Sequence, residues 1–184
     1  MEILTIGHSN HELEKFLQLL KANNIEVLVD IRSNPYSRFA SQFNKNNLSK
    51  AIQSTGIKYL FLGKEFCGRP KDRKFYDSEG HVLYSRLSES PLFLEGIERL
   101  INGIKTYRVA LMCSEENPAN CHRYLLVSIV LEDRGIAVFH IRGDGRIQSK
   151  DDLSRENEEF KDNQQQSLFR EKHPHERKST QSAL

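Results

Sequence analysis

Cysteine is scarce in this chain of 184 residues, which contains three. They are Cys67, Cys113 and Cys121. A small secreted domain stabilised by disulfides has a denser and usually even set of cysteines. The odd, sparse set therefore indicates reduced thiols and predicts a cytoplasmic protein.

Long hydrophobic runs are also missing. No segment approaches the roughly 18 consecutive apolar residues of a membrane helix, and the N-terminus MEILTIGHSN does not resemble a secretory signal. We therefore expect no membrane partner. The length and a hydrophobic content of 38% predict one domain over residues 1–148. From residue 149 apolar residues become rare, which predicts a polar tail over 149–184 that is partly helical and otherwise disordered.

Charge of one sign is not in excess either. The formal net charge of +2 is too small to indicate a nucleic-acid partner by itself. Basic residues do cluster in the segment 64–74, KEFCGRPKDRK, which is either a solvated loop or a phosphate-facing one. One alternative function is therefore a nucleic-acid-binding module that uses this segment together with Arg38, Phe39, Phe75 and Tyr76.

What the sequence does contain is a series of short apolar segments that alternate with helical patterns. The segments predicted as strands are 2–6, 26–31, 57–62, 108–112 and 136–141. This alternation predicts a three-layer α/β fold, with a mostly parallel, doubly wound sheet of about five strands and helices on both faces.

Helix-start signals lie between these segments. Ser9 and Glu12 form an S-x-x-E capping box for a first helix. Asn117-Pro118 supplies an N-cap and a first-turn proline for a later helix whose predicted inward face includes Leu125 and Ile129. Residues 63–90 read as a long loop with at most one helical turn, and loops of that length are usually functional or mobile.

Polar side chains follow the predicted strands, at the edge where doubly wound sheets bind ligands. They are His8 and Ser9 after the first strand, Asp30, Arg32 and Ser33 after the second, and Cys113 and Glu115 after the fourth, followed by His122 and Arg123. We expect these segments to meet in one pocket.

The residue types suggest an enzyme, a hydrolase or a transferase, that acts on a phosphate-bearing or nucleotide-like small molecule. Carboxylates and imidazoles suit proton transfer, and the candidates are Asp30, Glu115, His8 and His122. Guanidinium groups and a helix start suit an anion, and the candidates are Ser9, Arg32, Ser33 and Arg123. An ion pair between Asp30 and Arg32 that only closes the sheet edge is the alternative for those two residues.

Cys113 is a further catalytic candidate, because helix amides and a nearby arginine can acidify a thiol. The carboxylates of Glu115 and Glu116 oppose that effect, so a buried cysteine that only packs is the alternative. Cys113, Cys121 and His122 also offer zinc ligands, although C-x7-C-H is not a standard zinc spacing. A cysteine-based redox or metal-binding protein is thus the third possible function. The sequence indicates no particular cofactor or oligomeric state.

Five motifs resemble the domain-of-unknown-function 488 family. They are TIGHS (5–9), DIRSNPYS (30–37), YLFLG (59–63), LMCSEENPANCHR (111–123) and HI (140–141), of which CxE…CHR is the most specific. The resemblance covers residues 3–142 and implies a single α/β domain with a shared pocket, but no particular reaction. The segment GKEFCG at 63–68 departs from the family's leucine and paired glycines, so Cys67 is not expected to share a catalytic role.

Overall fold

The computed structural model describes residues 1–156, and the chain divides into two compact units, Met1–Ser149 and Lys150–Leu184. Residues 150–156, the described part of the second unit, are helical. The predicted disorder of the tail falls on residues outside the described range. No helix within residues 1–156 is long and apolar enough to cross a membrane.

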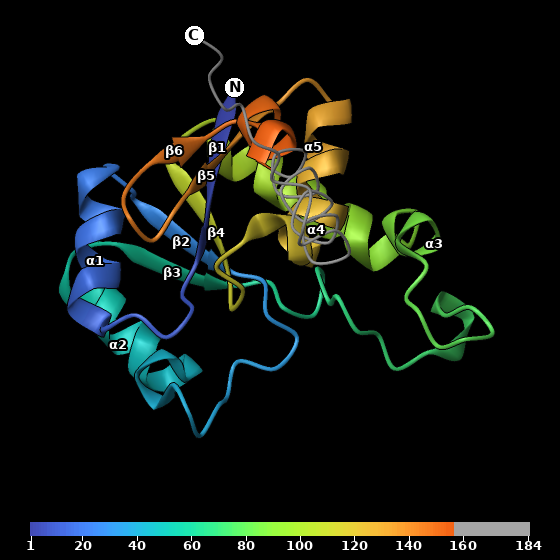
Figure 1. Ribbon diagram of the computed structural model, residues 1–184, viewed down its shortest axis with the longest axis horizontal. Coiled ribbons are helices and arrows are strands. Elements are labelled where there is room, and N and C mark those ends of the chain that lie inside the picture. Colours follow the sequence, from blue (N-terminus) through green and yellow to red (C-terminus); the bar gives the residue numbers. More distant parts are fainter. Residues whose placement is uncertain (157–184) are drawn as a thin grey trace, which may run out of the picture. The chain divides into compact units, whose positions relative to one another are not determined.

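Six strands of the first unit form one sheet in the order β3-β2-β4-β1-β5-β6 (Figure 1). They are β1 (Glu2–Gly7), β2 (Val27–Asp30), β3 (Lys58–Phe61), β4 (Val109–Cys113), β5 (Ala137–Ile141) and β6 (Ile147–Gln148). The first five pair in parallel, which confirms the predicted fold class. The two-residue β6 was not predicted and pairs antiparallel with β5.

Helices cover both faces of this sheet, as Figure 1 shows. The long ones are α1 (Leu13–Ala22) and α2 (Lys45–Ser54) on one face and α4 (Pro91–Ile104) on the other, where the shorter α5 (Ile129–Asp133) also lies. Successive strand residues point to opposite faces. Val109 and Leu111 of β4 therefore belong to the core cluster that contains α4, whereas Ala110 and Met112 belong to the one that contains α1 and α2.

The chain path diverges at β4. The neighbours of β4 in the sheet, β1 and β2, continue into α1 and α2 on one face. The chain after β4 continues into α5 on the opposite face. Strands whose connections diverge in this way leave space beyond their carboxyl ends, which is where open α/β sheets bind ligands. Cys113, the last residue of β4, therefore stands at the position that the topology favours most for a site.

The predicted capping box at the start of α1 is wrong. This helix begins at Leu13, and Glu12 occupies the N-cap position without a side-chain cap. Ser9 instead adopts a left-handed backbone conformation with φ of 47°. Its amide donates to the carbonyl of Ser114 at 2.8 Å, which ties it to the loop after β4. A hydrogen bond across the sheet edge thus takes precedence over the local helix-start signal.

The helix predicted after Asn117 is also different in the structure. The Asn117 side chain does accept from an amide, that of Ala119 at 2.9 Å, but only the 3-10 turn Pro118–Asn120 follows. Cys121 is then extended, with φ of −129°.

A six-residue π-helix, Arg123–Ser128, comes next and leads into α5. Its wider turn shifts the buried face, so Leu126 and Val127 are buried while Leu125 and Ile129, predicted to face inward, are about 40% exposed. Residues 63–90 contain a 3-10 turn, Arg73–Phe75, and one short helix, α3 (Tyr84–Ser88). Short π-helical segments often occur at functional sites.

Candidate functional site

Hydrogen bonds beyond the strand ends join the predicted site segments. The amide of His8, after β1, donates to the carbonyl of Cys113 at 2.9 Å. The amide of Ile31, after β2, donates to the carbonyl of Met112 at 3.1 Å. The segments that follow β1, β2 and β4 therefore lie side by side at the carboxyl edge of the sheet, as we expected from the alternating pattern.

Asp30 and Arg32 form a buried ion pair at this edge. The Nε and Nη2 atoms of Arg32 donate to the two carboxylate oxygens at 2.9 and 2.6 Å. The Tyr59 hydroxyl also donates to Asp30 at 2.6 Å, and burial together with this carboxylate raises the pKa of Tyr59. Asp30 is fully buried, and its oxygens are occupied by these donors. The structure thus shows the ion pair that was one of two alternatives for these residues.

His8 is held in its neutral form beside this pair. Its Nδ1 lies 2.7 Å from the carbonyl of Ser9, so Nδ1 carries the proton, because a carbonyl only accepts. Its Nε2 accepts from Nη1 of Arg32 at 3.1 Å, and its ring stacks on Phe43 with centroids 4.4 Å apart. Burial, and next the charge of Arg32, lower the pKa of His8 to about 4.

Arg123 holds the loop that follows β4. Its guanidinium donates to the carbonyl of Glu115 and, at 2.6 Å, to that of Glu116. The side chain is fully buried, and burial lowers its pKa. Within residues 1–156 its Nε has no hydrogen-bond partner. Arg123 therefore fixes the backbone of the loop rather than presenting its charge to a ligand.

Cys113, Cys121 and His122 converge in the same region. The Sγ atoms of Cys113 and Cys121 lie 3.7 and 3.9 Å from Nδ1 of His122, and the three atoms are all within 4.8 Å of one another. The other ring nitrogen, Nε2, lies 3.1 Å from the carbonyl of Ile31. Within residues 1–156, these three side chains are the group that could hold a metal ion.

Hydrogen bonding between the two thiols separates their pKa values. The bond from Cys121 lowers the pKa of Cys113, and the interaction with His122 adds to this effect against the cost of burial. The same bond, with burial, raises the pKa of Cys121. Burial lowers the pKa of His122, but the hydrogen bond and the negative charge of Cys113 outweigh it and leave the pKa raised.

A pocket of about 290 Å³ opens onto this group. Its lining comes from the segment after β2, from the end of β4 and the segment after it, from residues 120–122, and from the loop before α3 with the first residue of α3. The lining residues are Arg32, Ser33, Asn34, Gly68, Arg69, Tyr84, Cys113, Ser114, Glu115, Asn120, Cys121 and His122. Four predicted site residues do not line it, but each forms a hydrogen bond with a residue that does. These are Ser9, His8, Asp30 and Arg123.

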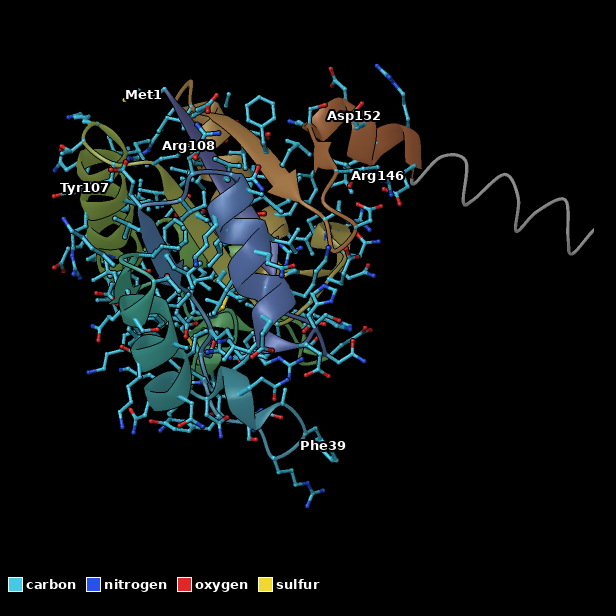
Figure 2. All side chains as sticks on the ribbon, turned by 90° about the vertical axis from the view of Figure 1, so that its left-hand side faces the viewer. Met1, Phe39, Tyr107, Arg108, Arg146 and Asp152 are labelled. Atoms are coloured by element: carbon cyan, nitrogen blue, oxygen red, sulfur yellow. The ribbon has the colours of Figure 1, made fainter. Side chains whose placement is uncertain are left out.

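A larger hollow, of about 410 Å³, lies at the opposite edge of the sheet, where β2 and β3 begin. Figure 2 shows Tyr107, which lines it, and Arg108 at the far end of the first unit from Phe39, in the loop after β2. Its ionisable side chains are Lys21, Glu26, Lys58 and Tyr107. Because no thiol or imidazole from the described part of the chain lines it, the pocket of about 290 Å³ is the better candidate for chemistry.

Several residues that line the pocket were not predicted as site residues from the sequence. Asn34 and Asn120 lie within the motifs DIRSNPYS and LMCSEENPANCHR but gave no other signal, and Tyr84 lay in a segment that was predicted to be a loop. Arg69 belongs to the basic segment that was considered phosphate-facing. The unusual length of the segment 63–90 was the signal that pointed to Arg69 and Tyr84.

Comparison with known proteins identifies the family. The model of the family described as Domain of unknown function DUF488 matches residues 12–130, which confirms the resemblance drawn from the motifs. The matched range contains the CxE…CHR segment, whereas TIGHS at 5–9 lies before it. No curated protein and no solved structure matches the chain.

Proposed function

Because the chain belongs to this DUF488 family, whose description names no reaction, we propose from the pocket itself that the protein is an enzyme for a small, phosphate-bearing or nucleotide-like molecule. The reaction is a hydrolysis or a group transfer. One observation supports this most strongly: an acid, two arginines, two thiols and an imidazole from separate chain segments line one pocket at the carboxyl edge. Three free cysteines are consistent with work in a reducing compartment such as the cytoplasm.

The polar lining favours an anionic ligand. Arg69 is exposed and forms no ion pair within residues 1–156, so its charge is free to meet a phosphate. Arg32 contributes less charge, because Asp30 neutralises it. Hydroxyl and amide groups that can bind phosphate or sugar oxygens complete the wall, and these belong to Ser33, Asn34, Tyr84 and Asn120.

Glu115 is the proposed general acid or base. Among the described residues it is the one carboxylate that lines the pocket, and its side chain is exposed while Arg123 fixes its backbone carbonyl. Asp30 and His8 take a different role in this proposal from the one the sequence suggested. Their atoms are engaged with Arg32 and Ser9, so they position the edge of the pocket rather than transfer protons.

Replacing Glu115 with Gln tests this assignment. We expect the variant to fold and to bind ligand, while turnover falls about 10²–10⁴-fold, the usual contribution of general acid–base catalysis. A melting-temperature screen over nucleotides and sugar phosphates first identifies ligands, and turnover of each is then followed by mass spectrometry. Glu14→Gln, on the exposed side of α1, is the control. Equal turnover by the Glu115 variant and the wild type would remove Glu115 from the mechanism.

Nucleic-acid binding is a second candidate, which one observation favours. Phe39 is 86% exposed, and the Arg38 guanidinium lies 4.8 Å from its ring centroid. Exposed aromatic and arginine side chains stack on unpaired bases. Binding of a labelled single-stranded oligonucleotide, measured by anisotropy, should then weaken steeply with salt and lose affinity in Phe39→Ser. Binding that neither salt nor this substitution alters excludes the candidate.

A further inference from the structure

We propose that Cys113, Cys121 and His122 form a binding site for one zinc-like divalent metal ion, with a fourth coordination position open to the pocket. Both sulfurs and the histidine Nδ1 are ligand atoms that zinc prefers. They come from the end of β4 and from the turn before the π-helix, and all three side chains line the pocket.

The distances between the sulfurs and the imidazole nitrogen are close to those around a shared metal ion. A tetrahedral zinc ion about 2.3 Å from sulfur and about 2.0–2.1 Å from nitrogen places those two atoms about 3.6 Å apart. The observed Sγ–Nδ1 distances are 3.7 Å for Cys113 and 3.9 Å for Cys121. The single Nδ1 has one lone pair or one proton, so it can form a hydrogen bond with only one of the two thiols at a time. A metal ion between the three atoms serves all of them.

The surroundings of His122 direct Nδ1 towards the sulfurs. Its Nε2 donates to the carbonyl of Ile31 at 3.1 Å, which leaves Nδ1 unprotonated in the neutral ring and available as a ligand. Metal-binding histidines commonly donate their second nitrogen in this way. Asp30 and Arg32 flank Ile31, so their ion pair fixes the carbonyl that orients the ring.

Arg123 provides two further features that suit metal-bound thiolates. The amide of Arg123 donates to Sγ of Cys121 at 3.4 Å, and N–H donors of this kind stabilise a thiolate. The guanidinium of the same residue is buried and has no carboxylate partner within the described residues. Its two hydrogen bonds go to backbone carbonyls. Negative charge on the neighbouring sulfurs would compensate this buried cation.

The local backbone also leaves space for the imidazole. A Cβ atom at Gly68 would lie 2.6 Å from Cγ and 2.9 Å from Nδ1 of His122, so any other residue there would displace the ring. Gly68 therefore provides a steric test of the site that removes no ligand. Gly103, at which a Cβ would meet nothing within 4 Å, is the matched control.

The open position faces the pocket beside Glu115, and it could take a water molecule or an oxygen of the ligand. Catalytic use of the ion rests on the proposed function, but binding of the ion does not. A protein that binds metal and turns over no phosphate ester or nucleotide would contradict the enzyme proposal alone. An enzyme that is fully active after chelation and without bound metal would contradict a catalytic metal alone.

The test is metal binding to the full chain. Protein stripped with a chelator under reducing conditions is titrated with Zn²⁺ against a chromogenic competitor and, separately, with Co²⁺ by absorption spectroscopy. We expect one ion per chain and thiolate-to-cobalt charge-transfer absorption. Cys121→Ser and His122→Gln should each weaken Zn²⁺ binding at least 10-fold, and Gly68→Ala should also weaken it. Cys67→Ser and Gly103→Ala should bind as the wild type does.

Three results would overturn the site. One is Zn²⁺ affinity in the wild type no higher than in the Cys113→Ser/Cys121→Ser double variant. Another is a cobalt complex without thiolate absorption. The third is mass spectrometry that finds a Cys113–Cys121 disulfide in the protein together with no metal binding after its reduction, which would identify the pair as a redox dithiol. Circular dichroism of each variant separates loss of the site from loss of the fold.

Discussion

Replacing Asp30 with Asn should lower the free energy of unfolding by about 3–5 kcal/mol, the usual cost of breaking a buried ion pair from one side. The substitution leaves the Arg32 guanidinium buried with an amide in place of its counter-ion. Arg32 has only 5% of its surface exposed, so water cannot compensate for the lost partner. Denaturation in urea at neutral pH, monitored by circular dichroism, measures the change.

The chain contains a matched control for this variant. Asp144 and Arg146 have the same two-residue spacing, and Arg146 donates through Nε at 2.6 Å and through its amide at 2.9 Å to the carboxylate. Both side chains of this second pair are exposed to solvent. Asp144→Asn should therefore change stability far less than Asp30→Asn. Similar losses in the two variants would show that the pair at the sheet edge is not buried as described.

Acid should destabilise the protein through two buried neutral histidines. Burial, then the charges of Arg123 and Arg142, lower the pKa of His140 from 6.5 to about 3, and the pKa of His8 is lowered to about 4. Between those values and 6.5 the unfolded chain binds protons that the folded chain does not. Stability from these groups is therefore present above pH 6.5 and is lost as the pH falls. Between pH 7 and pH 5 the two histidines together lower the free energy of unfolding by about 3–4 kcal/mol.

Urea denaturation at a series of pH values measures this loss. His140→Gln should remove roughly half of the pH dependence that the two histidines give to the free energy of unfolding between pH 7 and 5. This expectation holds whatever the substitution does to the stability at pH 7. His81→Gln is the control, because His81 is exposed. An unchanged slope in the His140 variant would mean that this imidazole binds protons equally in the folded and unfolded states, which would contradict the lowered pKa.

The sheet could be predicted because its signals are local and consistent. Five apolar segments separated by helical patterns leave a parallel sheet as the simplest solution, and the strand bounds differ by only a few residues. The π-helix Arg123–Ser128 could not be predicted, because its apolar residues also fit an α-helical pattern. Its wide turn is visible only in the structure, where Leu126 and Val127 are buried and Arg123 is fixed against the loop. The Ser9 capping box failed for a similar reason, since a distant carbonyl binds its amide.

The location of the candidate site in the fold could be predicted from the sequence, but the contacts within it could not. The carboxyl ends of parallel strands lie at one edge of the sheet, so Cys113, Arg32 and His8 were expected to lie close together there. Which polar group pairs with which depends on side-chain direction and burial, which residue spacing does not determine. Arg123 illustrates this, because its sequence position suggested an anion site and its guanidinium binds two loop carbonyls.

The central claim, that the carboxyl-edge pocket is the ligand site, is tested most directly by amide chemical-shift mapping with a phosphate-bearing hit from the screen. The shifts should concentrate at residues 32–34, Arg69, Tyr84 and 113–122, around the pocket of about 290 Å³. Shifts centred instead on Lys21, Gly56 and Tyr107, around the hollow at the opposite edge, would contradict the account.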